Sequence, residues 1–120
     1  MMEIVKEFQF EAAHFLPHEP QTHPNRRVHG HSFVVEVAVA GEPDETTGLV
    51  LDFAKLQQAL ENVRVQLDHR LLNDVEGLKA PTLESLCRFI WNGLQEDLAG
   101  LSRVTVRRDS CKEKCSYAGR

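Results

Sequence analysis

The sequence predicts an α+β fold in which an antiparallel sheet carries two helices on one face. Near both ends of the chain, apolar and polar residues alternate, which is the pattern of half-buried strands. In the middle of the chain, apolar residues recur three and four positions apart, which is the pattern of amphipathic helices. The predicted order is therefore strand, strand, helix, helix, strand, strand, within a single domain over residues 1–120.

The first two strands are predicted on either side of a long loop. The inward-facing residues of the first strand are Phe8, Phe10, Ala12 and His14. Three prolines and no periodicity indicate a loop over residues 17–27. A second strand is expected over 31–40, with His31, Phe33, Val35, Val37 and Val39 on one face. Such a sheet leaves exposed edges, which we expect an oligomer to cover.

Two helices and two further strands follow. Asp52 is placed to cap a helix whose apolar stripe is Phe53, Leu56, Leu60, Val63 and Leu67. Residues 73–81 are expected to be a loop. Thr82 is placed to cap a second helix whose stripe is Leu83, Leu86, Ile90, Leu94 and Leu98. Alternation returns over 102–110, and residues 115–119 are expected to add a short final strand.

Composition narrows the function classes. The formal net charge of −4 offers no basic surface of the kind that nucleic-acid-binding proteins use. No apolar run approaches the roughly 20 residues that span a membrane, and the N-terminus mixes charges into its apolar residues, unlike a secretory signal. Three cysteines, an odd number, argue against a disulfide framework, so we expect a cytoplasmic protein.

Histidine placement indicates a metal site. His29 and His31 bracket one glycine, and residues two positions apart on a strand point to the same face. His14 ends the first strand on its inward face, so antiparallel pairing of the two strands would bring three imidazoles together. Three neutral nitrogen ligands around an open fourth position describe a catalytic zinc site. The alternative is three unrelated polar histidines, and His18 and His23 in the proline-rich loop are expected to be solvated.

The cupin metal motif uses similar residues. It also opens with His-x-His followed by a glutamate, and Glu36 lies five residues after His31. Cupins, however, are longer all-β chains with a second histidine motif, so the two predicted helices argue against this interpretation.

A second constellation pairs a carboxylate with an imidazole. Residues 67–74 place Asp68 beside His69 at the end of the first predicted helix. Such a carboxylate can orient and polarise a histidine that acts as a general acid or base. Taken alone, the signal is weak, because Asp–His pairs at helix ends are usually solvated.

Six short motifs occur in order across nearly the whole chain. They are FEAAHFLP, HGHSF, LDFAKL, LDHRLLND, PTLES and Cys-x3-Cys-x-Tyr. In this order they resemble the 6-pyruvoyl-tetrahydropterin synthase family, most closely its short bacterial branch, the 6-carboxy-tetrahydropterin synthases of queuosine (7-deazaguanine) biosynthesis. The resemblance implies the tunnelling fold (T-fold), in which ββααββ subunits join their sheets around a ring, typically as a homohexamer of two stacked trimers.

The resemblance also implies roles for individual residues. His14, His29 and His31 match the family's zinc ligands, and Asp68 and His69 match its catalytic Asp–His pair. In the family chemistry, zinc binds the side-chain hydroxyls of 7,8-dihydroneopterin triphosphate and acidifies the adjacent positions. A thiolate moves a proton, triphosphate is eliminated, and the carboxy branch then breaks a carbon–carbon bond and releases acetaldehyde.

Substrate contacts are implied near the C-terminus and in the loop. Asp109 falls near the family's pterin-anchoring carboxylate, which can accept both the 2-amino and the N3 hydrogens of a pterin. Thr82 and Ser110 are further pterin contacts by the same resemblance. Arg26 and Arg27 are either triphosphate contacts or solvated loop residues.

The sequence departs from the family pattern at the catalytic thiolate. The usual Cys-x3-His-x-His arrangement has Asn25 in place of the cysteine. A neutral amide has no proton-accepting pKa in the useful range and cannot replace a thiolate as general base. Cys87 is expected in the core of the second helix, and Cys111 and Cys115 are expected to be small buried thiols.

Three interpretations of the function follow. The first is an active 6-carboxy-tetrahydropterin synthase-like lyase in which Asp68 and His69 carry the proton transfer. The second is altered pterin chemistry, such as an aldolase-like cleavage of dihydroneopterin to a hydroxymethyl pterin. The third is a non-catalytic paralogue that binds zinc and a pterin.

Overall fold

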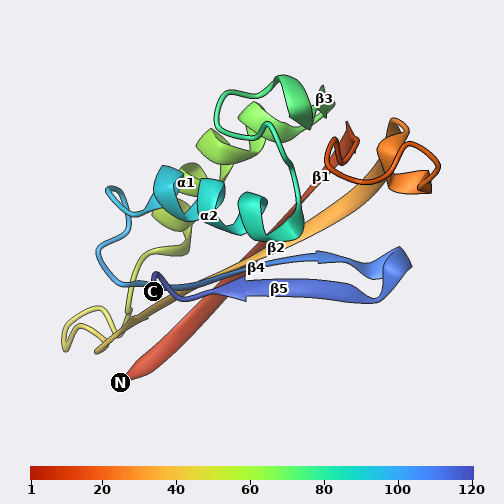
Figure 1. Ribbon diagram of the computed structural model, residues 1–120. Coiled ribbons are helices and arrows are strands. Elements are labelled where there is room, and N and C mark those ends of the chain that lie inside the picture. The colour runs from red at the N-terminus through yellow and green to blue at the C-terminus, as the bar shows by residue number, and fades with distance from the viewer.

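In the computed structural model, residues 1–120 fold into a five-stranded sheet with two helices packed on one face (Figure 1). The spatial order of the strands is β3-β1-β2-β4-β5. Helices α1 and α2 lie together on one side of this sheet, so the predicted α+β architecture with two helices on one face is confirmed.

The two longest strands form the centre of the sheet. Strands β1 (Met2–His14) and β2 (His29–Gly41) pair antiparallel along their whole length, with Phe10 opposite Phe33 and His14 opposite His29. The second strand thus begins two residues before its predicted start. This register brings the end of β1 and the start of β2 to the same point of the sheet.

Two shorter strands complete the far side of the sheet. Strand β4 (Leu101–Arg108) pairs antiparallel with β2, and β5 (Glu113–Tyr117) pairs antiparallel with β4. The turn between them contains a short 3-10 helix, η3 (Asp109–Cys111). The turn lies at the same end of the molecule as the loop that joins β1 to β2 (Figure 1).

Both helices begin at the capping residues that the sequence predicts. The Asp52 side chain accepts a hydrogen bond from the backbone of Ala54 ahead of α1 (Phe53–Leu67), and Thr82 accepts one from Ser85 ahead of α2 (Leu83–Leu94). Helix α2 ends before the last residue of its predicted stripe, but Leu98 is still buried. No helix is both long enough and apolar enough to cross a membrane.

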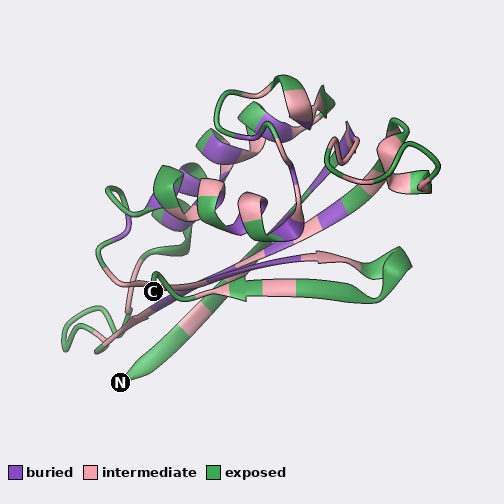
Figure 2. Ribbon diagram, viewed as in Figure 1, coloured by how far each residue is buried: buried purple, intermediate pink, exposed green.

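The core lies between the helices and the sheet (Figure 2). Phe10 and Phe33 are fully buried, and their rings stack with centroids 4.9 Å apart. Burial of one such ring stabilises the fold by about 1.5–3 kcal/mol relative to an exposed one. The pair supports the neighbouring histidines, because the Phe33 ring lies 5.8 Å from that of His14 and 5.5 Å from that of His31.

The sheet is mixed, whereas the sequence predicts an antiparallel one. Strand β3 (Arg70–Leu71) pairs parallel to β1 through Ala12 and Ala13. The chain is drawn to this edge because the backbone N–H of Glu11 donates to Asp68 (2.9 Å) and the N–H of His69 donates to the Glu11 carbonyl (2.6 Å). A two-residue strand fixed by such contacts leaves no periodicity in the sequence, and the short 3-10 helix η2 (Leu72–Asp74) follows it at once.

Candidate metal centre

Three histidines converge where β1 ends and β2 begins. The ring centroids of His14, His29 and His31 lie 4.6 to 5.1 Å apart. Each offers one ligand atom within 4.8 Å of the other two. The β1–β2 register produces this arrangement, because His14 is paired with His29 while His31 lies two residues further along the same face.

Backbone carbonyls orient two of the three rings. The Nδ1–H of His14 donates to the Pro81 carbonyl (2.9 Å), and the Nδ1–H of His29 donates to the Arg27 carbonyl (2.7 Å). A carbonyl only accepts, so each of these rings keeps its lone pair on Nε2. The Nε2 atoms of His14 and His31 are buried and lack a hydrogen-bond partner. Outer hydrogen bonds of this kind orient metal-ligating histidines, so the donor set fits a divalent metal ion.

Burial favours the neutral form of two of the three rings, those of His14 and His31. Desolvation is the main cause that lowers the pKa of His31 from 6.5 to about 4, and His14, Arg108 and His29 lower it further. Desolvation also lowers the pKa of His14, which is 1% exposed. Metal ligands must be deprotonated imidazoles, so protons compete little with a metal ion here at neutral pH.

The Asp68–His69 pair lies where β3 meets the edge of β1. Asp68 accepts from the His69 ring nitrogen Nδ1 at 2.8 Å. The pKa of Asp68 is lowered mainly by the hydrogen bond from the Glu11 backbone and next by the hydrogen bond from His69. His69 is 79% exposed and lines a shallow hollow with Glu11, Gly30 and His31. The pair therefore lies at the β3 edge of β1 and shares this hollow with one of the three histidines.

The backbone of His69 is strained. Its φ angle is +58°, in the left-handed region that costs a residue with a Cβ about 1–2 kcal/mol. Non-glycine residues held there cluster at functional sites. This conformation lets the side chain reach Asp68 while the ring stays open to solvent.

The loop that carries Asn25 returns to the histidine cluster. Asn25 lies in the short 3-10 helix η1 (Pro24–Arg26), which the His23 ring caps by accepting from the Asn25 N–H (3.1 Å). The Asn25 carbonyl accepts from the N–H of Leu16 at 2.7 Å, two residues after His14. Position 25 is therefore tied to the chain next to a predicted metal ligand. His23 is half-buried in this role and not simply solvated, whereas His18 is exposed.

The end of β4 does not present Asp109 to the histidines. The Asp109 carboxylate accepts from Arg107 (2.9 Å), whose guanidinium also pairs with Glu7 and Glu36 on the face of the sheet away from the helices. The residue that continues the inward alternation of Val104 and Val106 is Arg108. Its charge is among the causes that lower the pKa values of both His14 and His31.

Arg108 and its partner Glu113 are the site residues that sequence reasoning missed. Arg108 donates to the Glu113 carboxylate at 2.5 Å across the β4–β5 hairpin. The signal was present in the sequence as the period-two pattern of Val104, Val106 and Arg108.

The remaining predicted residues have varied surroundings. The Thr82 hydroxyl caps α2, one residue after the carbonyl that orients His14, and lines a hollow of about 190 Å³ with His18 and Glu19. Ser110 is exposed in η3. Arg26 donates to the Glu19 carbonyl within the loop at 3.0 Å.

The cysteines differ from one another. Cys87 is buried, as predicted, and its pKa is raised to about 12, mainly by desolvation. Cys115 is half-buried with its carbonyl accepting from the Cys87 thiol (3.2 Å). The expectation of a buried Cys111 is wrong, because η3 turns this residue out of the strand alternation and exposes it.

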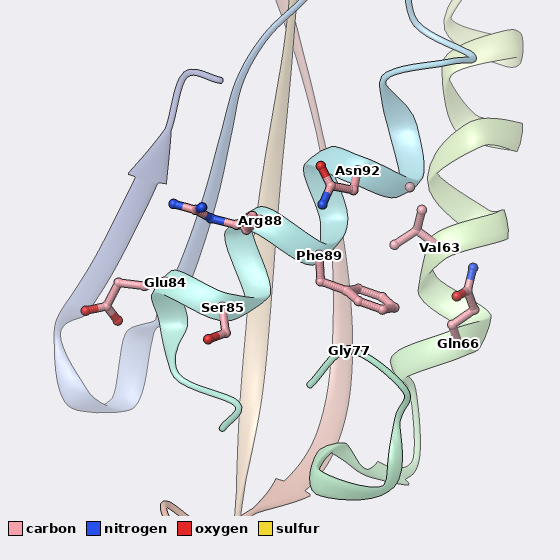
Figure 3. A pocket seen from close by; sticks show the side chains of 9 residues that line it. Val63, Gln66, Gly77, Glu84, Ser85, Arg88, Phe89 and Asn92 are labelled. Atoms are coloured by element: carbon pink, nitrogen blue, oxygen red, sulfur yellow. The ribbon is translucent and has the colours of Figure 1, made fainter. Parts of the chain in front are cut away.

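A larger hollow lies elsewhere, between the two helices (Figure 3). It measures about 600 Å³ and includes none of the three histidines. Its lining includes Glu84, Ser85 and Arg88 of α2 and Val63 and Gln66 of α1. The only group of three potential metal ligands is the histidine cluster, which lies outside this hollow.

Comparisons with known proteins agree with this geometry. A family model described as 6-pyruvoyl tetrahydropterin synthase matches residues 3–120. The chain is 43% identical over 123 aligned positions to the 6-carboxy-5,6,7,8-tetrahydropterin synthase of Synechocystis sp., covering 98% of this chain and 90% of that relative. It is 35% identical to the dihydroneopterin monophosphate aldolase of Pyrococcus furiosus, covering 81% of this chain and 78% of that relative.

The fold comparison gives the same result. The structure of Caenorhabditis elegans 6-pyruvoyl tetrahydropterin synthase matches with a TM-score of 0.87 and 29% identity, covering 99% of this chain and 96% of that chain. Fold and histidine cluster together define an enzyme subunit of the T-fold class. The chain belongs to the 6-pyruvoyl tetrahydropterin synthase family, as the order of its motifs predicted.

The lowered histidine pKa values predict an acid-labile metal-free protein. Unfolded histidines take up protons below about pH 6.5, whereas folded His31 does so only near pH 4. The unfolded state therefore binds more protons in this window, and the free energy of unfolding should fall as the pH drops from 6.5 towards 4. Urea titrations of chelator-treated protein across this range would measure the slope.

His31→Gln should flatten this pH dependence, and His18→Gln, which changes an exposed ring, should leave it as in the wild type. An unchanged slope in His31→Gln would contradict the assigned cause.

Proposed function

We propose that this chain is a zinc-dependent pterin lyase that acts on 7,8-dihydroneopterin triphosphate in the manner of 6-carboxy-tetrahydropterin synthase, in the queuosine (7-deazaguanine) pathway. One observation carries the proposal: each of the three histidines offers a ligand atom within 4.8 Å of the other two, and the Nε2 atoms of His14 and His31 are buried without a partner. The 43% identity to the Synechocystis enzyme supports the substrate class. Zinc fits because three neutral imidazoles with one open position form its usual catalytic donor set.

The metal site and the Asp68–His69 pair have different roles in the proposed reaction. The metal ion, when bound, polarises the oxygens of the pterin side chain and acidifies the neighbouring carbon–hydrogen bond. Asp68 orients the His69 ring through a 2.8 Å hydrogen bond, and His69 is the group proposed to give or take a proton. Within one chain, His69 shares only a shallow hollow with one histidine of the cluster, His31, so we infer that the full set of groups meets the substrate between chains.

A homo-oligomer, most simply the family's hexamer, would unite the two groups. Strand β1 is paired with β3 only at Ala12 and Ala13, so most of its outer edge is free, and β5 forms a second free edge. The radius of gyration is 15.5 Å, above the value of about 13.6 Å typical of a compact 120-residue domain. Both features suit a subunit that completes its packing against other copies.

A shared site predicts complementation between defective chains. A chain carrying His29→Ala and His31→Ala should be inactive, and so should a His69→Ala chain. When the two are co-expressed and mix at random, about a quarter of the shared sites combine both intact halves, so about a quarter of wild-type product formation should return. No recovery in a mixed oligomer, or a monomer in light scattering at micromolar concentration, would contradict the proposal.

Product analysis tests the reaction itself. With 7,8-dihydroneopterin triphosphate, the lyase should release 6-carboxy-tetrahydropterin and acetaldehyde, resolved by chromatography and an aldehyde assay. The second candidate function is aldolase-like cleavage, which the similarity to the Pyrococcus furiosus aldolase and the loss of the thiolate at Asn25 favour. A hydroxymethyl pterin from dihydroneopterin or its monophosphate would establish that function, and pterin binding without turnover would establish a non-catalytic paralogue.

Asn25 should limit the rate of the lyase reaction. General-base assistance is commonly worth about two to four powers of ten, and an amide supplies none. Asn25→Cys should therefore raise turnover of dihydroneopterin triphosphate, because position 25 is held beside the end of β1. Asn25→Ser is the matched control, since a hydroxyl of similar size is not a thiolate and should leave the rate low. Equal rates in all three proteins would show that another residue is the base.

A further inference from the structure

Arg108 lies beside the histidine cluster, on the same face of the sheet. Strand β4 alternates, so Arg108 shares the inward face of Val104 and Val106, both of which are fully buried. The pairing of Val34 with Arg107 places the next residue, Arg108, beside Phe33. The Phe33 ring lies within 6 Å of the rings of His14 and His31, at 5.8 and 5.5 Å.

The guanidinium of Arg108 is incompletely paired. Its side chain is 15% exposed, and one terminal nitrogen donates to Glu113. Its Nε is buried without a partner. The buried side-chain polar atoms that lack a hydrogen bond are His14 Nε2, His31 Nε2 and Arg108 Nε, so all three belong to this one region. Buried polar groups are normally satisfied, and each exception requires an explanation.

A guanidinium beside a metal site has a specific electrostatic consequence. Two positive centres repel each other in a poorly solvated site, and the single half-exposed carboxylate of Glu113 offsets only one charge. An anion between the metal ion and the guanidinium removes the repulsion and also gives the Arg108 Nε an acceptor. Guanidinium groups suit phosphate oxygens best, because their donors form a planar fork.

We propose that Arg108 makes the metal centre an anion-binding site and donates to a phosphate oxygen on the side chain of the pterin substrate. This assignment rests on the proposed metal centre and names the phosphorylated substrate class that the centre selects. The other arginines of β4 do not share the role. Arg103 pairs with Glu3, and Arg107 pairs with Glu7 and Glu36, on the opposite face of the sheet.

The test uses cobalt-loaded protein, because the visible spectrum of Co²⁺ reports both metal uptake and anion binding. Inorganic phosphate is titrated into the wild type, Arg108→Met, Arg108→Lys and the control Arg103→Met. Hydrogen bonds to charged groups predict about ten- to hundredfold weaker phosphate binding in Arg108→Met, with Arg108→Lys between it and the wild type. Arg103→Met should stay within about twofold of the wild type, since its charge lies on the other face.

Metal affinity should change in the opposite direction to phosphate affinity. Because Arg108 repels the metal ion, Arg108→Met should bind Co²⁺ at least as tightly as the wild type. Weaker metal binding in Arg108→Met would assign the residue a structural role and overturn the proposal. Unchanged phosphate affinity in a fully metal-loaded Arg108→Met protein would overturn it too, while leaving the metal centre in place. A wild type that takes up no Co²⁺ would reject the metal centre and this assignment with it.

A second titration identifies the source of the anionic oxygen. Neopterin and neopterin monophosphate are fluorescent and differ only in the phosphate. Arg108→Met should weaken the monophosphate about tenfold or more and neopterin by less than about twofold. Equal weakening of the two ligands would mean that Arg108 contacts the ring or the hydroxyls, and the phosphate assignment would be wrong.

Discussion

The antiparallel register of β1 with β2 places His14 opposite His29, and the remaining features of the site depend on that pairing. Side chains alternate along a strand, so a slip of one residue would turn His29 and His31 to the other face and separate them from His14. The stacked Phe10 and Phe33 rings hold the register, because a slip would also expose one of these fully buried side chains. Core packing and ligand geometry are therefore fixed by the same pairing.

Buried polar atoms at the histidine cluster lack hydrogen-bond partners, and this costs folding free energy. Backbone carbonyls orient His14 and His29, and burial keeps His14 and His31 neutral, yet their Nε2 atoms find no partner within the chain. An unsatisfied buried polar group costs about 1–3 kcal/mol, so a ligand that satisfies several of them gains affinity from a structure that is already arranged. The Nε of Arg108 is also unpartnered, so an anion bound beside the metal ion would gain affinity in the same way.

Much of the fold was predictable from the sequence because its signals are local. Both helix caps, the inward strand faces and the meeting of three histidines follow from periodicity and side-chain chemistry. The parallel strand β3 was not predictable, because contacts between Asp68 and the backbone of a distant strand create it. Nor was the outward turn of Asp109, which depends on where η3 interrupts the alternation of β4 and on the pull of Arg107. The positive φ of His69 likewise reflects contacts made across the sheet edge.

We expect three histidines from two paired strands to hold one metal ion per chain. The decisive measurement is metal analysis of protein purified without added chelator, repeated after zinc titration. The wild type should hold one equivalent of zinc, and a chain carrying both His29→Ala and His31→Ala should hold none, with the folded structure verified by circular dichroism. Full zinc occupancy in that double variant would show that these histidines are not the ligands.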